Sequence, residues 1–287
     1  MEQSDSYRRG MIFLHRGNLE QAKRAFEEAL AATRQEEGQE LTALLIHLAN
    51  VCAALGEGEK ASDLYQEVLS LQREKIGQEV DRRAVGLTLV NLGNLCREKG
   101  EAERARAYYL EGSDLLHQAA DDLSLGILYS NFGLLEEEGG RTDEAISFFK
   151  KAIDLHKKTG HEEGLAATWG QLGKTFTRIG KDKDAEICFN HASTHFNRLG
   201  NPAGEAEALR SLSFLYQKRG DPELALHSLV GVQEIYRRIG WPVQKEDETR
   251  IGELSRMRKG PSSEIKRFPT DDSISKPISE PTSKEPS

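Results

Sequence analysis

A single glycine recurs along this chain at an almost constant interval. Its six copies stand 39, 44, 40, 40 and 40 residues apart in a sequence of 287 residues. They are Gly17, Gly56, Gly100, Gly140, Gly180 and Gly220. Each copy separates two amphipathic stretches of helical period, which is typical of an array of helical hairpins. A hairpin of this size cannot bury its apolar face alone, so we expect the repeats to stack on one another.

Three further positions keep a fixed distance from each turn glycine. An alanine stands five residues after it: Ala22, Ala61, Ala105, Ala145, Ala185 and Ala225. A large apolar side chain follows four residues later: Phe26, Tyr65, Tyr109, Phe149, Phe189 and Leu229. A small residue stands seven residues before the turn glycine: Gly10, Ala49, Gly93, Gly133, Gly173 and Ser213. We expect the turn glycine to take a positive φ, the small residues to allow close helix crossing, and the large side chain to fill the space toward the next hairpin.

These positions carry a resemblance to a known family. The fifth unit reads Trp169-x2-Leu172-Gly173-x2-Phe176, followed by Ala185-x3-Phe189. This pattern resembles the tetratricopeptide repeat, whose motif is Trp-x2-Leu-Gly-x2-Tyr and Ala-x3-Phe. The first unit is the weakest copy, because Ser6 and Arg9 stand where apolar residues are expected. The resemblance implies an all-α, right-handed superhelical solenoid of about six helix-turn-helix hairpins.

The repeats are expected at residues 3–39, 42–80, 84–122, 126–160, 164–200 and 204–240. A capping helix is expected over 243–259, with Ile251, Leu254 and Met257 on its packing face. Together these elements form a solenoid over 1–259, and the Pro- and Ser-rich segment 260–287 is expected to be a disordered tail. The period exceeds the common 34 residues. It is similar to the arrays of kinesin light chains, Pins-type adaptors and MalT-like regulators.

Composition excludes several functions. With 39 basic and 47 acidic residues, the net charge is −8, which disfavours nucleic acid as a partner. No apolar run is long enough for a membrane span, and no signal peptide opens the chain, so we expect a cytoplasmic protein that does not contact a membrane. The 3 cysteines form no paired motif, and His191 with His195 supplies only two metal ligands. No catalytic, cofactor or metal site is predicted.

The candidate binding residues lie on the first helix of each hairpin, on the face that points into the concave groove of the family. Two residues before the small packing residue stand His47, Asn91, Asn131, Gln171 and Ser211. One residue after it stand Asn50, Asn94, Leu134, Lys174 and Phe214. Adding the basic residues of the last units, the predicted groove consists of His47, Asn50, Asn91, Asn94, Asn131, Gln171, Lys174, Arg178 and Arg210.

Two interpretations of the repeated amides stay open. A row of carboxamides can pair the N–H and C=O groups of an extended peptide, which resembles the asparagine ladder of kinesin light chains and Pins-type adaptors. Alternatively, the amides bond to neighbouring helices and hold the repeats in register. The charges of the same face suggest an acidic centre at Glu98, Glu137 and Glu138, followed by a basic C-terminal half.

We therefore expect a non-enzymatic adaptor that binds an extended or helical segment of another protein in its concave groove. The alternative is a ligand- or peptide-responsive regulator that acts on a separate transcription or signalling protein. Self-association through the terminal repeats is a further expectation. For the 260–287 segment, a solubilising tail is favoured over docking of that tail into the groove.

Overall fold

The computed structural model describes residues 5–33, 39–73 and 79–257, and the expected tail lies outside these ranges. The described residues form thirteen α-helices. They are α1 (Asp5–His15), α2 (Leu19–Thr33), α3 (Gln39–Ala54), α4 (Gly58–Arg73), α5 (Glu79–Glu98), α6 (Ala102–Gln118), α7 (Asp122–Glu138), α8 (Thr142–Thr159), α9 (Glu162–Arg178), α10 (Asp182–Arg198), α11 (Pro202–Lys218), α12 (Pro222–Arg238) and α13 (Lys245–Met257).

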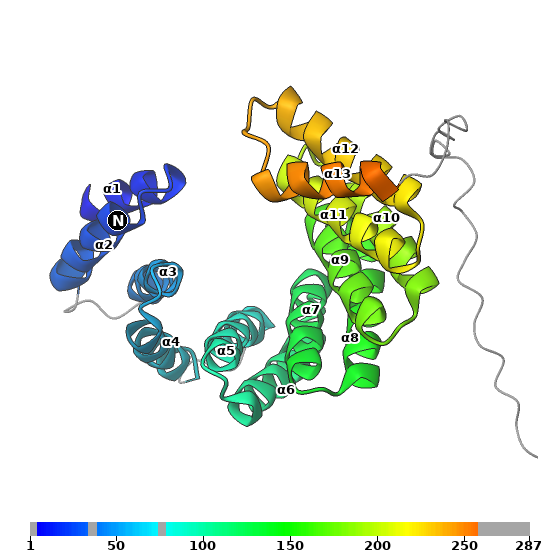
Figure 1. The fold of residues 1–287 in the computed structure, drawn as a ribbon. Coiled ribbons are helices and arrows are strands. Elements are labelled where there is room, and N and C mark those ends of the chain that lie inside the picture. The colour runs from blue at the N-terminus through cyan, green and yellow to red at the C-terminus, as the bar shows by residue number, and fades with distance from the viewer. Residues whose placement is uncertain (1–4, 34–38, 74–78, 258–287) are drawn as a thin grey trace, which may run out of the picture.

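The helices pair into successive hairpins, and each hairpin packs on the next along an open arc (Figure 1). The first helices of neighbouring hairpins also contact each other directly, as α5 does with α7 and α7 with α9. In Figure 1 these odd-numbered helices lie along the inner side of the arc, and their partners lie outside. The all-α solenoid predicted from the repeats is confirmed.

The turn glycines adopt the conformation expected of them. All six have φ between 73° and 80°, and Gly160, Gly200 and Gly240, which end the long second helices, have φ of 67°, 63° and 71°. In this region an L side chain crowds the following carbonyl, so glycine is favoured. The backbone therefore places a reversal at each point that the sequence predicts.

The small residue and the large side chain of one hairpin pack directly against each other. A Cβ atom on Gly93 would lie 2.4 Å from the Tyr109 ring, and one on Gly133 would lie 2.6 Å from the Phe149 ring. The ring thus occupies the space inside its own hairpin, which corrects the expectation that it fills only the space toward the next one. Tyr109 also reaches the next hairpin, where its ring centre is 5.5 Å from that of Phe132.

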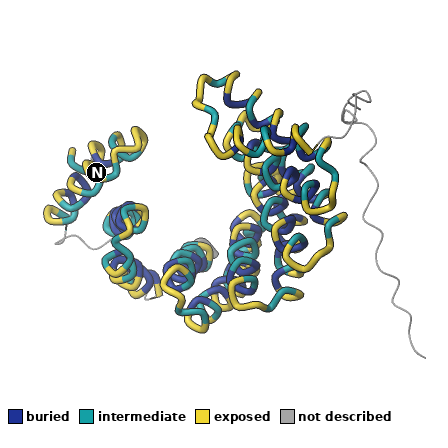
Figure 2. Tube along the Cα trace, in the orientation of Figure 1, coloured by how far each residue is buried: buried dark blue, intermediate teal, exposed yellow. Residues whose placement is uncertain are grey.

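Apolar residues are buried along the whole array, and no single central core collects them. Figure 2 shows buried positions between the helices of every hairpin, with exposed positions on the turns and outer surfaces. Large buried side chains occur from Phe26 near one end to Tyr216 and Leu254 near the other. Among the described helices, none is both long and apolar enough to cross a bilayer.

The last helix, α13, covers the end of the array. Leu254 is 1% exposed and Ile251 packs beside it against the core, as the sequence predicts. Met257 is 55% exposed, so it does not belong to the packing face to which the sequence assigned it. It is the last residue of α13.

One backbone position predicts a stabilising substitution. Ala120 has φ of 50° at the place where the later repeats have Gly160, Gly200 and Gly240. Replacing Ala120 with glycine should relieve the left-handed strain and raise the free energy of unfolding by about 0.5–1 kcal/mol, after the entropy of the unfolded glycine is subtracted. The neighbouring Ala119→Gly variant, at φ −85°, is the matched control and should lose stability. Urea unfolding of both variants checks this, and equal effects would contradict it.

Candidate functional site

Three of the predicted amides lie in phase on neighbouring inner helices. Asn91 is on α5, Asn131 on α7 and Gln171 on α9, and all three side chains are partly exposed. Within the described ranges, no hydrogen bond is recorded for any of their side-chain amides. Because an amide carries both donors and an acceptor, this row presents unsatisfied hydrogen-bonding groups to the inner side of the arc.

The amides three positions further along behave differently. The hydroxyl of Tyr65 donates a hydrogen bond to the side-chain oxygen of Asn50. The hydroxyl of Tyr109 likewise donates to Asn94 Oδ1 at 2.6 Å. Burial raises the pKa of both tyrosines, so each hydroxyl keeps its proton and remains a donor. Asn50 and Asn94 therefore tie the two helices of their own hairpins together.

The amino-acid sequence contains a signal for this Tyr–Asn pairing. Asn50 and Asn94 occur in the two hairpins whose large second-helix residue is tyrosine. Where that residue is Phe149 or Phe189, which has no hydroxyl, the position holds Leu134 or Lys174 instead. Asn50 and Asn94 thus bond to the second helix of their own hairpin and not between repeats. The row of Asn91, Asn131 and Gln171 shows no such bond in the described ranges.

The side chain of His47 contacts residues of its own and the preceding hairpin. Its Nδ1 atom lies 2.7 Å from the Ala43 carbonyl oxygen, and its ring lies 5.7 Å from the Tyr7 ring and 5.8 Å from the Phe26 ring. At the same phase in α11, the Ser211 hydroxyl donates to the Glu207 carbonyl at 3.0 Å. These two ends of the predicted row are occupied by local contacts.

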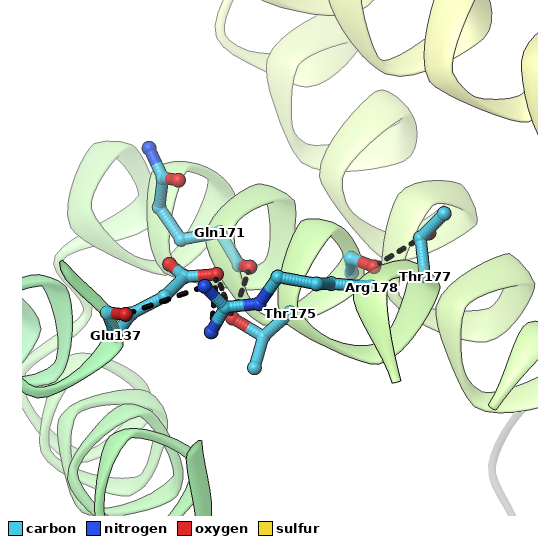
Figure 3. Close-up of polar contacts among 6 residues, drawn as sticks. Glu137, Gln171, Thr175, Thr177 and Arg178 are labelled. Atoms are coloured by element: carbon cyan, nitrogen blue, oxygen red, sulfur yellow. Dashed lines mark hydrogen bonds and ion pairs between the residues drawn. The ribbon is translucent and has the colours of Figure 1, made fainter. Parts of the chain in front are cut away.

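The charges of the inner face are paired between repeats. Figure 3 shows the side chains of Thr175 and Arg178 on α9 reaching toward Glu137 on α7. The Thr175 hydroxyl donates to Glu137 Oε1 at 2.9 Å, and the Arg178 guanidinium donates to the Glu137 carbonyl at 3.3 Å. Lys174 lies 3.3 Å from a Glu207 carboxylate oxygen. The Glu137–Arg178 pair joins the predicted acidic centre to the basic end, and Lys174 is paired with another carboxylate, so part of the expected charge order is neutralised by pairs between repeats.

Arg210 has a defined structural partner. Its guanidinium donates to both carboxylate oxygens of Asp247, at 2.7–3.1 Å, and to the Tyr236 hydroxyl at 2.9 Å. The hydrogen bonds to Asp247 raise the pKa of Arg210, and Asp247 is itself 3% exposed. This bidentate contact attaches the capping helix α13 to α11 and α12.

A pocket of about 360 Å³ lies at the C-terminal end of the inner face, between α9 and α11. It is lined by Lys174, Thr177, Arg178, Phe189, Arg210, Ser211 and Phe214. Three residues of the predicted groove are thus brought together here. Phe214, which is 57% exposed, and Thr177 were not in the predicted set. An apolar ring beside cationic side chains suits the side chain of a bound peptide.

The described ranges contain no group of three or more His, Cys, Asp or Glu side chains placed to hold a metal ion. The three cysteines are buried and unpaired. Burial raises the pKa of Cys52 to about 11 and that of Cys188 to about 12, so both remain protonated thiols. His195 contacts Glu162, at 2.6 Å between Nδ1 and the carboxylate.

The stacked hairpins and their amide-lined inner face define a helical-repeat solenoid. A sequence model described as tetratricopeptide repeat matches residues 2–74, 39–118 and 84–158. Together these ranges cover more than half of the chain, which therefore belongs to the tetratricopeptide repeat family. No curated protein matches the sequence at a significant level.

Solved structures share the fold at low sequence identity. BtubC (BKLC) from P. vanneervenii is 18% identical, with a TM-score of 0.65 over 92% of this chain and 100% of that one. Aspartyl phosphate phosphatase F from Bacillus subtilis is 13% identical, with a TM-score of 0.65 over 92% of this chain and 73% of that one. A putative kinesin light chain from Podosopora anserina is 14% identical, with a TM-score of 0.56 over 68% of this chain and 94% of that one.

Proposed function

We propose that this protein is a non-enzymatic adaptor that binds an extended peptide segment of another protein along its inner face. The observation that carries the proposal is the row of unpaired amides at Asn91, Asn131 and Gln171. Tetratricopeptide repeat proteins typically act by protein–protein interaction, and in the described ranges this row of amides has no hydrogen bond to the protein itself.

The spacing of the row suits an extended backbone. The helices α5, α7 and α9 pack in direct contact, and packed helices lie about 8–10 Å apart. An extended chain advances about 3.3 Å per residue, so each amide meets about every third peptide unit. Amides bonded to the peptide backbone do not read side chains, and the pocket around Phe214 supplies the selectivity for one apolar anchor.

The alternative function is regulation in response to a ligand. The structure of RapI and that of a Rap protein complexed with Competence and Sporulation Factor align over 88% of this chain, with TM-scores of 0.65 and 0.64. Under this alternative, a bound peptide changes the curvature of the solenoid. Small-angle scattering with and without a bound peptide separates the two, because an adaptor with a preformed groove keeps its radius of gyration.

The adaptor proposal predicts the behaviour of two matched variants. Linear peptides selected from a displayed library against the full chain should lose affinity at least about tenfold when Asn91 and Asn131 are both changed to alanine. The melting temperature should stay close to that of the wild type, because neither amide has a hydrogen-bond partner within the described ranges. Fluorescence anisotropy and thermal unfolding provide the two measurements.

The control is Asn94→Ala, which removes the amide bonded to Tyr109. We expect this variant to lose about 1 kcal/mol of stability and to keep its peptide affinity. The proposal fails if Asn91→Ala/Asn131→Ala binds the selected peptides as tightly as the wild type. It also fails if that double variant loses stability as Asn94→Ala does.

A further inference from the structure

A second groove lies on the outer side of the arc, away from the amide row. It runs between α8 and α10, which both pack on α9, and it encloses about 660 Å³. Its floor is formed by Trp169, Leu172 and Phe176 of α9. In Figure 1, α8 and α10 lie on the outer side of the array.

One polar contact made by the second helix at several other junctions is absent at this groove. The residue directly after the repeated alanine makes such a contact at three of them: Lys23 with Glu57, Arg106 with Glu136, and Glu186 with Tyr216 and Arg219. In α8 the equivalent residue is Ile146, and it lines the groove together with Phe176. An apolar side chain thus stands where three other repeats have a polar one that bonds across the junction.

The floor of the groove contains a buried hydrogen-bond donor, the indole N–H of Trp169, without an acceptor in the described ranges. Trp169 is 4% exposed, and its Nε1 atom is buried without a hydrogen-bond partner in the described part of the chain. A buried indole N–H normally finds an acceptor. Ile187, on the α10 wall, is 45% exposed although it faces the same apolar surface. The half-exposed Ile187 side chain on an apolar wall fits a surface that is completed by another molecule.

Two lysines mark the ends of the apolar floor. The Lys157 ammonium lies 5.4 Å from the Trp169 ring centre, and the Lys181 ammonium lies 6.0 Å from the Phe176 ring centre. Neither lysine forms an ion pair within the described ranges. The two rings are seven residues apart on α9, which is about 10 Å or two helical turns. The remaining charged residues of the lining are Asp143, Lys150, Asp154 and Asp184.

We propose that this outer groove binds an amphipathic α-helix of a partner protein. The helix lays apolar side chains at i, i+3 and i+7 on the floor, and acidic side chains seven residues apart reach Lys157 and Lys181. The lining residues of α8 extend from Asp143 to Lys157, so the groove holds about 14 residues of helix, or about 21 Å. Asp143, Asp154 and Asp184 disfavour a partner helix whose edges are acidic throughout.

The test uses a displayed library of helical peptides of about 16 residues, randomised along one face and its edges, with the full chain as bait. Ile187→Glu places a charge in the groove at a half-exposed position. Leu110→Glu is the matched control, because Leu110 is 52% exposed on α6, outside the groove. Circular dichroism verifies that both variants are folded.

The readout comes from the groove itself. The chain has 2 tryptophans, so Trp241→Phe leaves Trp169 as the sole tryptophan reporter. We expect selected peptides to carry an apolar stripe with two acids seven residues apart, and to shift Trp169 emission. Ile187→Glu should weaken binding at least about tenfold, whereas Leu110→Glu and Asn91→Ala/Asn131→Ala should leave it unchanged. Selected peptides that bind Ile187→Glu equally well, leave Trp169 emission unaltered or carry basic residues at both end positions would overturn the proposal.

Discussion

Replacing Glu136 with alanine is expected to lower the free energy of unfolding by about 3 kcal/mol. Glu136 is fully buried on α7 and pairs with Arg106 of α6, at 2.5 Å, and with Arg141 of the following turn. Removing the carboxylate leaves two guanidiniums against an apolar junction. Both arginines are partly exposed and can turn toward water. The loss of stability is therefore at the lower end of the range expected when a buried ion pair is broken. Urea unfolding followed by circular dichroism measures the change.

The control for this prediction is Glu111→Ala, which breaks an exposed pair with Arg73 between α6 and α4. Both side chains of that pair are nearly half exposed, so the loss should stay below about 1 kcal/mol. The burial of Glu136 is the difference between the two variants. Similar losses from both variants would show that Glu136 does not hold hairpins α5–α6 and α7–α8 together.

Acidification is expected to lower the stability of the protein by about 3 kcal/mol through His156 alone. This side chain is 1% exposed, and burial together with the charge of His161 lowers its pKa to about 4. The unfolded pKa is near 6.5, so protonation favours the unfolded chain. The contribution of His156 is complete above pH 6.5 and is lost as the pH falls from 6.5 to about 4.

The surroundings of His156 support this sign. His161 Nδ1 lies 3.2 Å from His156 Nδ1, and the Ser130 hydroxyl lies 3.3 Å from His156 Nε2. Backbone crowding comes from Gly126 and Gly164, where an added Cβ would approach the imidazole within 3 Å. Within the described ranges no carboxylate contacts this imidazole, so its charged form gains no ion pair there.

Unfolding measured between pH 7.5 and 4.5 tests the prediction. The His156→Gln variant should show a flatter pH dependence than the wild type, because it cannot be protonated in this range. His117→Gln, at an exposed histidine on α6, should follow the wild-type curve. If His156→Gln loses stability on acidification as steeply as the wild type does, other groups cause the loss.

The sequence predicts part of the candidate site. The phase of Asn91, Asn131 and Gln171 follows from helical period alone, and these amides are the ones without local partners. Asn50 and Asn94 share the residue type and the helix face, yet tyrosine hydroxyls occupy them. The distinction depends on a hydroxyl 15 residues away, which periodicity does not report.

The charged residues required the tertiary structure in a different way. Arg178 was assigned to a basic groove, but it pairs with Glu137, 41 residues earlier. Arg210 was assigned to the same groove, but Asp247 of the capping helix binds it. Each side chain is long and flexible, so several partners lie within reach along the sequence. Only the relative placement of neighbouring helices selects among them.

The sequence by itself determined the hairpins, their turns and the close crossing of their helices. These features depend on residues within one repeat, where glycine, alanine and an aromatic ring leave the backbone few alternatives. The tertiary structure decided which polar groups are paired, and it produced the outer groove at Ile146 and Trp169. Such contacts join side chains of different repeats, and their formation depends on distances of a few ångströms that the repeat pattern does not fix.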